Sequence, residues 1–291
     1  MLKNYLSLIK FSHTIFAMPF SLIGFFLALN KSGNFDFSDK EIYIKLLLVI
    51  LCMVFARSAA MAFNRYLDRK FDAKNPRTAI REIPSGKITS QQALIFTVIT
   101  SLLFIIVCYF INDICFYLSP VALAVVLGYS YTKRFTWLCH IVLGLGLSLA
   151  PMGAYLAVTG SFHWLPMLFS FAVIFWVSGF DIIYALQDEA FDKEHNLYSI
   201  PAFLGKKKGL RISALLHLFS VVAVLIAGYS GNFGWCYWIG SAIFTGILIY
   251  QHSLVKPNDL SRVNLAFMTS NGIASVVFAI FVIADLLIKN I

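Results

Sequence analysis

Residues 57–86 read RSAAMAFNRYLDRKFDAKNPRTAIREIPSG, and they place three oxygen-bearing side chains at the end of an apolar segment. These side chains belong to Asn64, Asp68 and Asp72. Carboxylates at the edge of a membrane are costly unless something binds them. A second acidic stretch, DIIYALQDEAFD at residues 181–192, follows much later in the chain. We predict that the two stretches face each other across one site.

The composition is that of a polytopic membrane protein. The chain has 291 residues, of which 59% are hydrophobic and 13% charged, and its mean hydropathy is +0.80. Soluble domains carry about 25% charged residues. The net charge of +9 is expected in a membrane protein, because cytosolic loops retain Lys and Arg. We therefore predict the lipid bilayer as a partner, no nucleic acid and no obligate protein partner.

Apolar windows of about 20 residues, each long enough for one bilayer crossing, predict an all-α bundle with nine transmembrane helices. The windows lie at residues 13–30, 43–66, 91–111, 114–131, 138–158, 164–187, 210–229, 233–252 and 264–288. The first window resembles a signal peptide but lacks a good cleavage site, so we expect it to remain. No linker or soluble domain interrupts the pattern, and residues 1–291 are predicted to form a single transmembrane domain.

Basic residues predict the orientation of these crossings. If the N-terminus is cytosolic, the inner segments hold most of the Lys and Arg, and the outer segments hold only Lys31, Lys40, Lys45 and Lys289. Short Lys- and Arg-rich loops stay in the cytosol. The chain is therefore predicted to lie in a bacterial plasma membrane with its N-terminus inside and its C-terminus outside. Both acidic stretches then open on the cytosolic side.

Helical spacing places the polar residues of each stretch on one face, because positions four or seven apart align on an α-helix. The first face contains, at intervals of seven, four and four, Arg57, Asn64, Asp68 and Asp72. The second contains, at intervals of seven and four, Asp181, Asp188 and Asp192. Carboxylate and amide oxygens are hard ligands suited to Mg²⁺, which binds proteins through a few carboxylates and substrate phosphates. One such face alone is also typical of a solvated helix end, whereas two on one side of a membrane favour a site.

Three further residues end the fourth predicted span on the same side. Tyr129, Lys133 and Arg134 have two interpretations. They either hold phosphate oxygens or form a membrane-interface anchor of aromatic and basic residues.

The chain resembles the UbiA superfamily of intramembrane aromatic prenyltransferases, which 4-hydroxybenzoate polyprenyltransferase typifies. Residues 57–86 are similar to the first signature of that family and residues 181–192 to the second. A weaker third element matches the YxxxK pattern from Tyr129 to Lys133. The resemblance covers essentially the whole chain. The opening residues 10–19 differ from the Arg-rich start of some members, which leaves the identity of the acceptor open.

This resemblance implies a helical bundle around a central cavity with a cytosolic cap after the second and sixth spans. It implies Mg²⁺ as the cofactor, held with the diphosphate of a polyprenyl donor by Asn64, Asp68, Asp72, Asp188 and Asp192. The four aspartates among these are the implied catalytic residues, and Asp181 helps to shape the second face. The remaining substrate-binding residues, which contact the diphosphate or the acceptor's carboxylate, are Arg57, Tyr129, Lys133 and Arg134.

The implied reaction transfers a polyprenyl group from a polyprenyl diphosphate to an aromatic acid in respiratory quinone biosynthesis. The acceptor is 4-hydroxybenzoate on a ubiquinone route or a dihydroxynaphthoate on a menaquinone route. One alternative is another prenyltransferase of the same family with a different acceptor. The chief alternative from a different class is a transporter that uses intramembrane Asp and Arg residues. The clustering of the acids at one membrane face disfavours transport.

Overall fold

The structure is a computed structural model that describes residues 2–9, 16–33 and 38–289. Within these ranges every extended regular element is helical, as the sequence predicts. The helices, in chain order, are α1 (Leu2–Leu8), α2 (Met18–Ser32), α3 (Lys40–Lys74), α4 (Ser90–Ile111), α5 (Asp113–Thr132), α6 (Cys139–Thr159), α7 (Trp164–Ala185), the 3₁₀ turn η2 (Leu186–Asp188), α8 (Glu189–Glu194), α9 (Ile200–Ser230), α10 (Trp235–Leu254), the π-helix η3 (Leu265–Ser270) and α11 (Asn271–Ile288).

The membrane character of this bundle is plain from its surface. Large apolar side chains such as Ile99, Leu102 and Ile106 stand exposed along α4, where only lipid would cover them. Among the described residues, seven helical segments are long and apolar enough to cross a membrane. Neither α2 nor α10 is among those seven. The all-helical integral membrane class is confirmed, and the predicted count of nine crossings is not.

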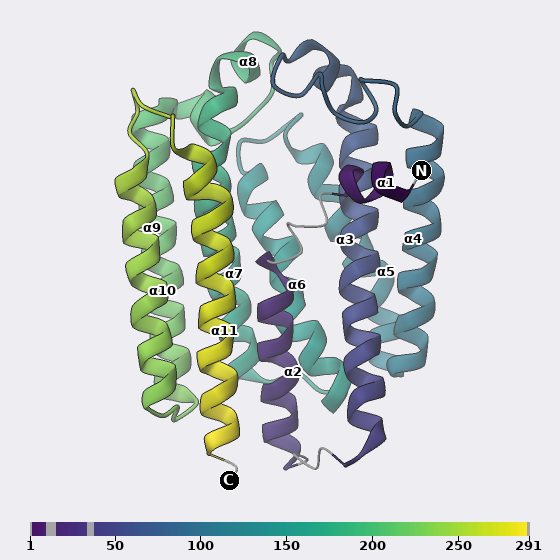
Figure 1. The fold of residues 1–291 in the computed structure, drawn as a ribbon, viewed down its shortest axis with the longest axis vertical. Helices are drawn as coiled ribbons and strands as arrows, with labels where there is room; N and C mark the ends of the chain where they lie inside the picture. The colour runs from purple at the N-terminus through teal and green to yellow at the C-terminus, as the bar shows by residue number, and fades with distance from the viewer. Residues whose placement is uncertain (1, 10–15, 34–37, 290–291) are drawn as a thin grey trace.

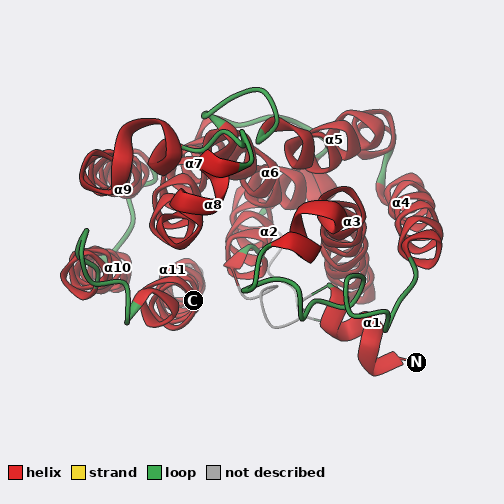
Figure 2. Ribbon diagram, turned by 90° about the horizontal axis from the view of Figure 1, so that it is seen from above, coloured by secondary structure: helices red, strands yellow, loops and turns green. Residues whose placement is uncertain are grey.

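The long helices run side by side along one axis (Figure 1). Seen from above, α9 and α10 lie at one side of the bundle and α4 at the other (Figure 2). Residues 75–89, between α3 and α4, and residues 186–199, between α7 and α9, cover the end of the bundle away from the C-terminus (Figure 1). We call these two segments the cap.

Local sequence explains where the cap begins and ends. Asn75, the extended C-cap residue of α3, precedes Pro76, and a helix ends before proline because the ring restricts the preceding residue and lacks an N–H. The next helix, α4, starts at a capping box in which the Thr89 and Gln92 side chains satisfy each other's backbone N–H groups. Such caps are worth about 1 kcal/mol. The first cap segment is thus fixed at both ends.

An aromatic core packs around α7, the helix that carries the start of the second acidic stretch. Phe20 of α2 packs on Trp176 of α7 with ring centroids 5.3 Å apart, and Trp176 packs on Phe244 of α10 at 6.0 Å. Phe278 of α11 completes the cluster, 5.1 Å from Phe244. Pairs of this kind add about 0.5–1.5 kcal/mol beyond their burial. The part of α7 around Trp176 is therefore fixed by packing against α2 and α10, and α11 packs on α10 in turn.

Candidate active site

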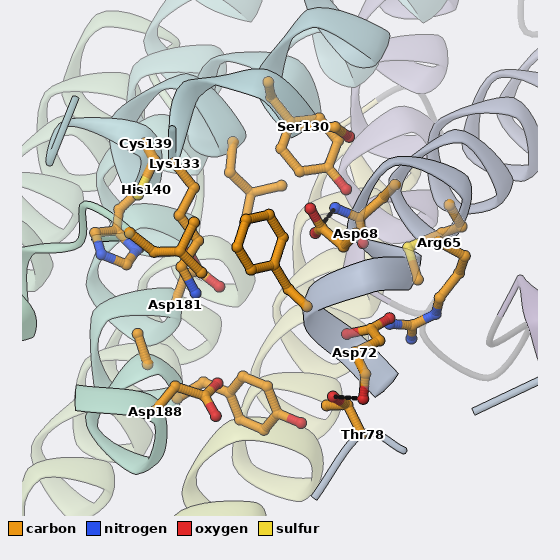
Figure 3. Close-up of a pocket in the computed structure, with 18 of the residues that line it drawn as sticks. Arg65, Asp68, Asp72, Thr78, Ser130, Lys133, Cys139, His140, Asp181 and Asp188 are labelled. Atoms are coloured by element: carbon orange, nitrogen blue, oxygen red, sulfur yellow. Dashed lines mark hydrogen bonds and ion pairs between the residues drawn. The ribbon is translucent and has the colours of Figure 1, made fainter. Parts of the chain in front are cut away.

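The two acidic stretches meet in one pocket of about 280 Å³ beneath the cap. Figure 3 shows Asp68 and Asp72 on one side of this pocket and Asp181 and Asp188 on the other. The predicted site residues that line it are Arg57, Asn64, Asp68, Asp72, Tyr129, Lys133, Asp181, Asp188 and Asp192. The tenth, Arg134, reaches the same place through an ion pair with Asp68. Segments far apart in sequence are thus brought together.

The acids of α3 each hold a basic side chain. Asp68 accepts a hydrogen bond from Asn64 Nδ2 at 3.1 Å and one from Arg134 Nη2 at 2.9 Å. Asp72 accepts from Arg81 Nη1 at 2.7 Å through Oδ1. Its other oxygen, Oδ2, is buried with no hydrogen-bond partner among the described residues. One oxygen of Asp72 is therefore unused by the fold.

Asp188 joins the two cap segments. Arg77 donates to it twice, from Nε to Oδ1 at 3.1 Å and from Nη2 to Oδ2 at 2.5 Å. Asn75 Nδ2 donates to the same carboxylate at 3.1 Å. Burial alone would lower the pKa of the Arg77 guanidinium, but the Asp188 carboxylate outweighs it and raises this pKa above its usual value. Bidentate pairs of this kind are among the strongest polar contacts in proteins.

Asp192 is the most deeply buried of these acids. It is 0% exposed, and it pairs with Lys133 Nζ at 2.8 Å and accepts from Ser199 Oγ at 2.9 Å. Burial alone would lower the pKa of the Lys133 ammonium, but the ion pair with Asp192 outweighs this effect and raises the pKa above its usual value. An acid so buried needs a counter-charge, and Lys133 supplies it.

The second acidic stretch is not one continuous helical face. The first stretch is, because α3 runs without a break to Lys74. By contrast, α7 ends at Ala185, Asp188 closes the 3₁₀ turn η2, and Asp192 lies on α8. A 3₁₀ turn winds more tightly, at about three residues per turn. The second stretch is therefore not the uninterrupted helix that the spacing assumes, although all three of its acids line the pocket.

An apolar cavity of about 400 Å³ continues from the polar pocket toward the other end of the bundle. Arg57, Met61, Tyr129, Leu143 and Leu147 line both spaces. The Nε atom of Arg57 is buried with no hydrogen-bond partner among the described residues. A charged group thus stands where a polar chamber passes into an apolar one.

Residues 17–273 match the model of the UbiA prenyltransferase family. The chain belongs to this family. It shares 32% identity over 235 residues with 4-hydroxybenzoate octaprenyltransferase of Tolumonas auensis, covering 80% of this chain and 82% of the relative. The enzyme of the same name from Nitrosospira multiformis is 29% identical over 244 residues, covering 84% and 83%. As the resemblance implied, the family is that of the UbiA prenyltransferases.

Solved structures share the fold. The apo structure of a UbiA homologue from Aeropyrum pernix K1 matches with a TM-score of 0.79 and 28% identity, over 96% of this chain and 98% of that one. A UbiA homologue from Archaeoglobus fulgidus bound to DMAPP and Mg²⁺ matches with a TM-score of 0.75 over 98% and 99% of the two chains. At 19% identity, the second comparison speaks for the fold alone.

The donor atoms in the pocket of this family member suit a hard cation. In the part of the chain that the structure describes, no three His, Cys, Asp or Glu side chains gather closely enough to hold a metal. Each of the four acids Asp68, Asp72, Asp188 and Asp192 forms an ion pair with a basic side chain. Asp72 Oδ2, already buried and unpartnered, has the carboxylate chemistry that Mg²⁺ prefers. The chemistry of the donor atoms therefore suits Mg²⁺.

Several residues of the site were not assigned from the sequence. Arg77 and Arg81 belong to the first family signature, but no role in the site was predicted for either of them. His140 lies in the pocket and had no pattern to mark it.

Proposed function

We propose that this protein transfers a polyprenyl group from a polyprenyl diphosphate to a ring carbon of an aromatic acid, with the help of Mg²⁺. One observation carries the proposal: an acid-lined and base-lined pocket opens directly into a large apolar cavity. A polyprenyl diphosphate has the same division into a charged head and an apolar tail. The naming of curated relatives as 4-hydroxybenzoate octaprenyltransferases supports it.

The charged head would bind by exchange of ionic partners. Asn64, Asp68, Asp72, Asp188 and Asp192 would hold Mg²⁺, which when bound neutralises charge on the diphosphate leaving group. The basic side chains that now pair with these acids, Arg77, Arg81, Lys133 and Arg134, would then be available to the phosphate oxygens. Guanidinium and ammonium groups aimed at a leaving group stabilise the negative charge that it gains.

The reacting carbon would lie among aromatic side chains. Rings of Tyr184 and Phe267 stack with centroids 4.2 Å apart, and both line the polar pocket with Phe180. When the allylic carbon–oxygen bond breaks, the electron pair leaves with the diphosphate and a carbocation remains. Aromatic faces attract cations, and the apolar surroundings exclude water that would quench this one.

The acceptor would meet Arg57 at the junction of the two chambers. Because that guanidinium is buried with an unpartnered Nε, an anionic ligand there would offset the cost of burying an unpaired charge. The carboxylate of an aromatic acid fits this requirement, and Tyr129 lines the same junction. The ring carbon ortho to the phenolic hydroxyl then attacks the allylic cation. 4-Hydroxybenzoate is the first acceptor to test and a dihydroxynaphthoate the second.

The orientation of the bundle is part of the proposal. The cap and the pocket lie at the end of the bundle where basic loop residues gather, so we assign them to the cytosol, with the N-terminus inside and the C-terminus outside. Residues 1–291 would act as one transmembrane domain. The apolar outer surface would place the tail-binding cavity within the bilayer, where polyprenyl donors partition.

The test is product identification. The purified protein in detergent would be given Mg²⁺, octaprenyl diphosphate and a panel of aromatic acids that includes 4-hydroxybenzoate and dihydroxynaphthoates. We expect one panel member to gain the mass of the prenyl group less one hydrogen. Failure to prenylate any acid, with the protein shown to be folded, would overturn the proposal.

A further inference from the structure

A buried histidine contacts the acid at the start of the second acidic stretch. His140 of α6 is 2% exposed, and its Nδ1 lies 2.7 Å from Oδ2 of Asp181 on α7. Figure 3 shows the two side chains together, across the pocket from Asp68. Ser178 Oγ donates to the His140 carbonyl at 3.1 Å, which ties the backbones of α6 and α7 at the same level.

The surroundings fix the tautomer of this histidine. The backbone N–H of Ile200, at the start of α9, donates to His140 Nε2 at 3.3 Å. A ring nitrogen that accepts a hydrogen bond carries no proton. Nδ1 therefore carries a proton, which His140 donates as a hydrogen bond to Asp181 Oδ2.

Asp181 differs from the other four acids in the pocket. Each of those pairs with a guanidinium or an ammonium at 2.9 Å or less. Asp181 pairs with a histidine instead, and its side chain is 24% exposed. Its second oxygen, Oδ1, has no hydrogen-bond partner within the described ranges. Asp181 lines the pocket, and it has no Lys or Arg partner, unlike the other four acids.

We propose that Asp181 is the proton acceptor of the reaction and that His140 is the positioning residue that aims it. The inference rests on the proposed function. Once the ring carbon has bonded to the allylic carbon, that ring carbon carries both the new substituent and its original hydrogen. Asp181 takes this hydrogen as a proton, the C–H electron pair restores the aromatic ring, and Asp181 becomes a neutral acid. The diphosphate has already left with the electron pair of the broken carbon–oxygen bond.

The contacts of His140 explain how the carboxylate is kept in place. Because Nε2 is held by Ile200, the ring cannot turn away from Asp181 without losing a buried hydrogen bond. Ile200 itself follows Ser199, whose hydroxyl binds Asp192, and Tyr198 N–H donates to the Lys133 carbonyl at 2.7 Å. The segment that positions His140 is thus anchored to the same cap that carries Asp192.

The experiment compares the wild type with His140→Ala, His140→Gln and Asp181→Asn. Each protein is assayed with 4-hydroxybenzoate and with the same acid deuterated at both ring carbons ortho to the hydroxyl. We expect Asp181→Asn to lower kcat by about 10²–10⁴-fold, the usual contribution of a general base. We expect His140→Ala to lower kcat by roughly 10–100-fold, as loss of an orienting partner does elsewhere, with KM changed far less.

The deuterium comparison separates positioning from mere support of the fold. In His140→Ala, proton loss slows, so the isotope effect on kcat should exceed that of the wild type. The glutamine side chain in His140→Gln can donate to Asp181 through its amide and accept from Ile200 through its oxygen. This variant should therefore recover most of the wild-type kcat and most of the wild-type isotope effect. Equal isotope effects in His140→Ala and the wild type, or no recovery with glutamine, would overturn the inference.

A matched control is available in the same bundle. His217 is also buried and hydrogen-bonded, to His252 at 2.9 Å and to the Trp176 carbonyl, but it does not line the pocket. His217→Gln should leave the isotope effect unchanged. If Asp181→Asn and His140→Ala turn over normally while Asp188→Asn is inactive, this inference fails and the proposed function stands. Full activity in Asp188→Asn would count against the proposed function itself.

Discussion

Two buried acids at opposite ends of the bundle are held in different ways. Asp285 is 3% exposed and accepts hydrogen bonds from the backbone N–H groups of Gly234 at 2.7 Å and Tyr237 at 3.3 Å. Asp192, at the cap, is held by the side chains of Lys133 and Ser199. Backbone amides at a helix start cannot move away, whereas side chains can. An acid held by backbone serves the fold, and an acid held by side chains can change partner for a ligand.

The immediate neighbour of Asp285 supports this interpretation. A Cβ atom at Gly234 would lie 2.8 Å from Asp285 Oδ1, so the close approach of backbone to carboxylate requires glycine there. Around Asp72, by contrast, a carboxylate oxygen is left buried and unpartnered. Buried polar atoms without a hydrogen-bond partner are rare in native folds, so each one calls for an explanation. Burial alone therefore does not mark a functional acid, but the kind of partner does.

The largest effect should follow substitution of a cap acid. Asp188→Asn keeps the shape of the side chain but removes the charge that binds Arg77 and, in our proposal, Mg²⁺. We expect kcat to fall by about 10²–10³-fold or more, as loss of a key electrostatic group does, measured as prenylated product by mass. Thermal unfolding in the same detergent should show the protein still folded. Turnover at the wild-type rate would contradict the distinction between the two kinds of acid.

Removal of the unpartnered guanidinium should have the next largest effect. Arg57→Ala should raise KM for the aromatic acid, because a hydrogen bond to a charged group is worth about 1.5–3 kcal/mol, or roughly 10–100-fold. KM for the diphosphate donor should change much less. Initial rates with each substrate varied in turn would measure both. An unchanged KM for every acid would return Arg57 to a structural role.

A smaller and more selective effect is expected from filling the apolar cavity. A Cβ at Gly153 meets nothing within 4 Å, and Gly153 lines that cavity. Gly153→Leu should raise KM for octaprenyl diphosphate by about 10-fold, since overpacking costs about 1–3 kcal/mol, and should spare geranyl diphosphate. Gly246, also free of neighbours within 4 Å but outside both cavities, supplies the control Gly246→Leu. Equal losses with both donors would count against this cavity as the tail site.

The smallest effect on turnover should come from the structural acid. Asp285→Asn disturbs its two backbone hydrogen bonds and should lower the free energy of unfolding by about 1–3 kcal/mol, with kcat unchanged. Thermal unfolding and product formation, measured on one preparation, give both values. Loss of turnover in a protein of unchanged stability would show that Asp285 does more than serve the fold.

Periodic features of the sequence predicted much of this structure. Apolar windows predicted the helical membrane class. The spacing of Asn64, Asp68 and Asp72 predicted a face of α3 correctly, because the period of a helix does not depend on what packs against it. The break at Ala185 was not predictable, since a 3₁₀ turn leaves no periodic mark in so short a stretch. The family resemblance, with its two long signatures, is confirmed, whereas the individual site roles remain predictions.

Partners in space were harder to predict than positions along a helix. Nothing in the sequence pairs Arg77 with Asp188, because that contact depends on how the cap folds back over the bundle. His140 is a single polar residue near the start of an apolar helix, which is common in cores, and only its distance to Asp181 marks it. Asp285 belongs to neither acidic stretch, yet it accepts from backbone N–H groups at the start of α10.

Counting diphosphate against product tests the proposed transfer and its need for Mg²⁺ in one assay. The purified protein, with octaprenyl diphosphate and 4-hydroxybenzoate or the accepted aromatic acid, should release one diphosphate for each prenylated acid, and both should require Mg²⁺. Omission of the aromatic acid should suppress both signals. Release of diphosphate without a prenylated product, or a product formed equally well after removal of divalent cations, would contradict the proposed mechanism.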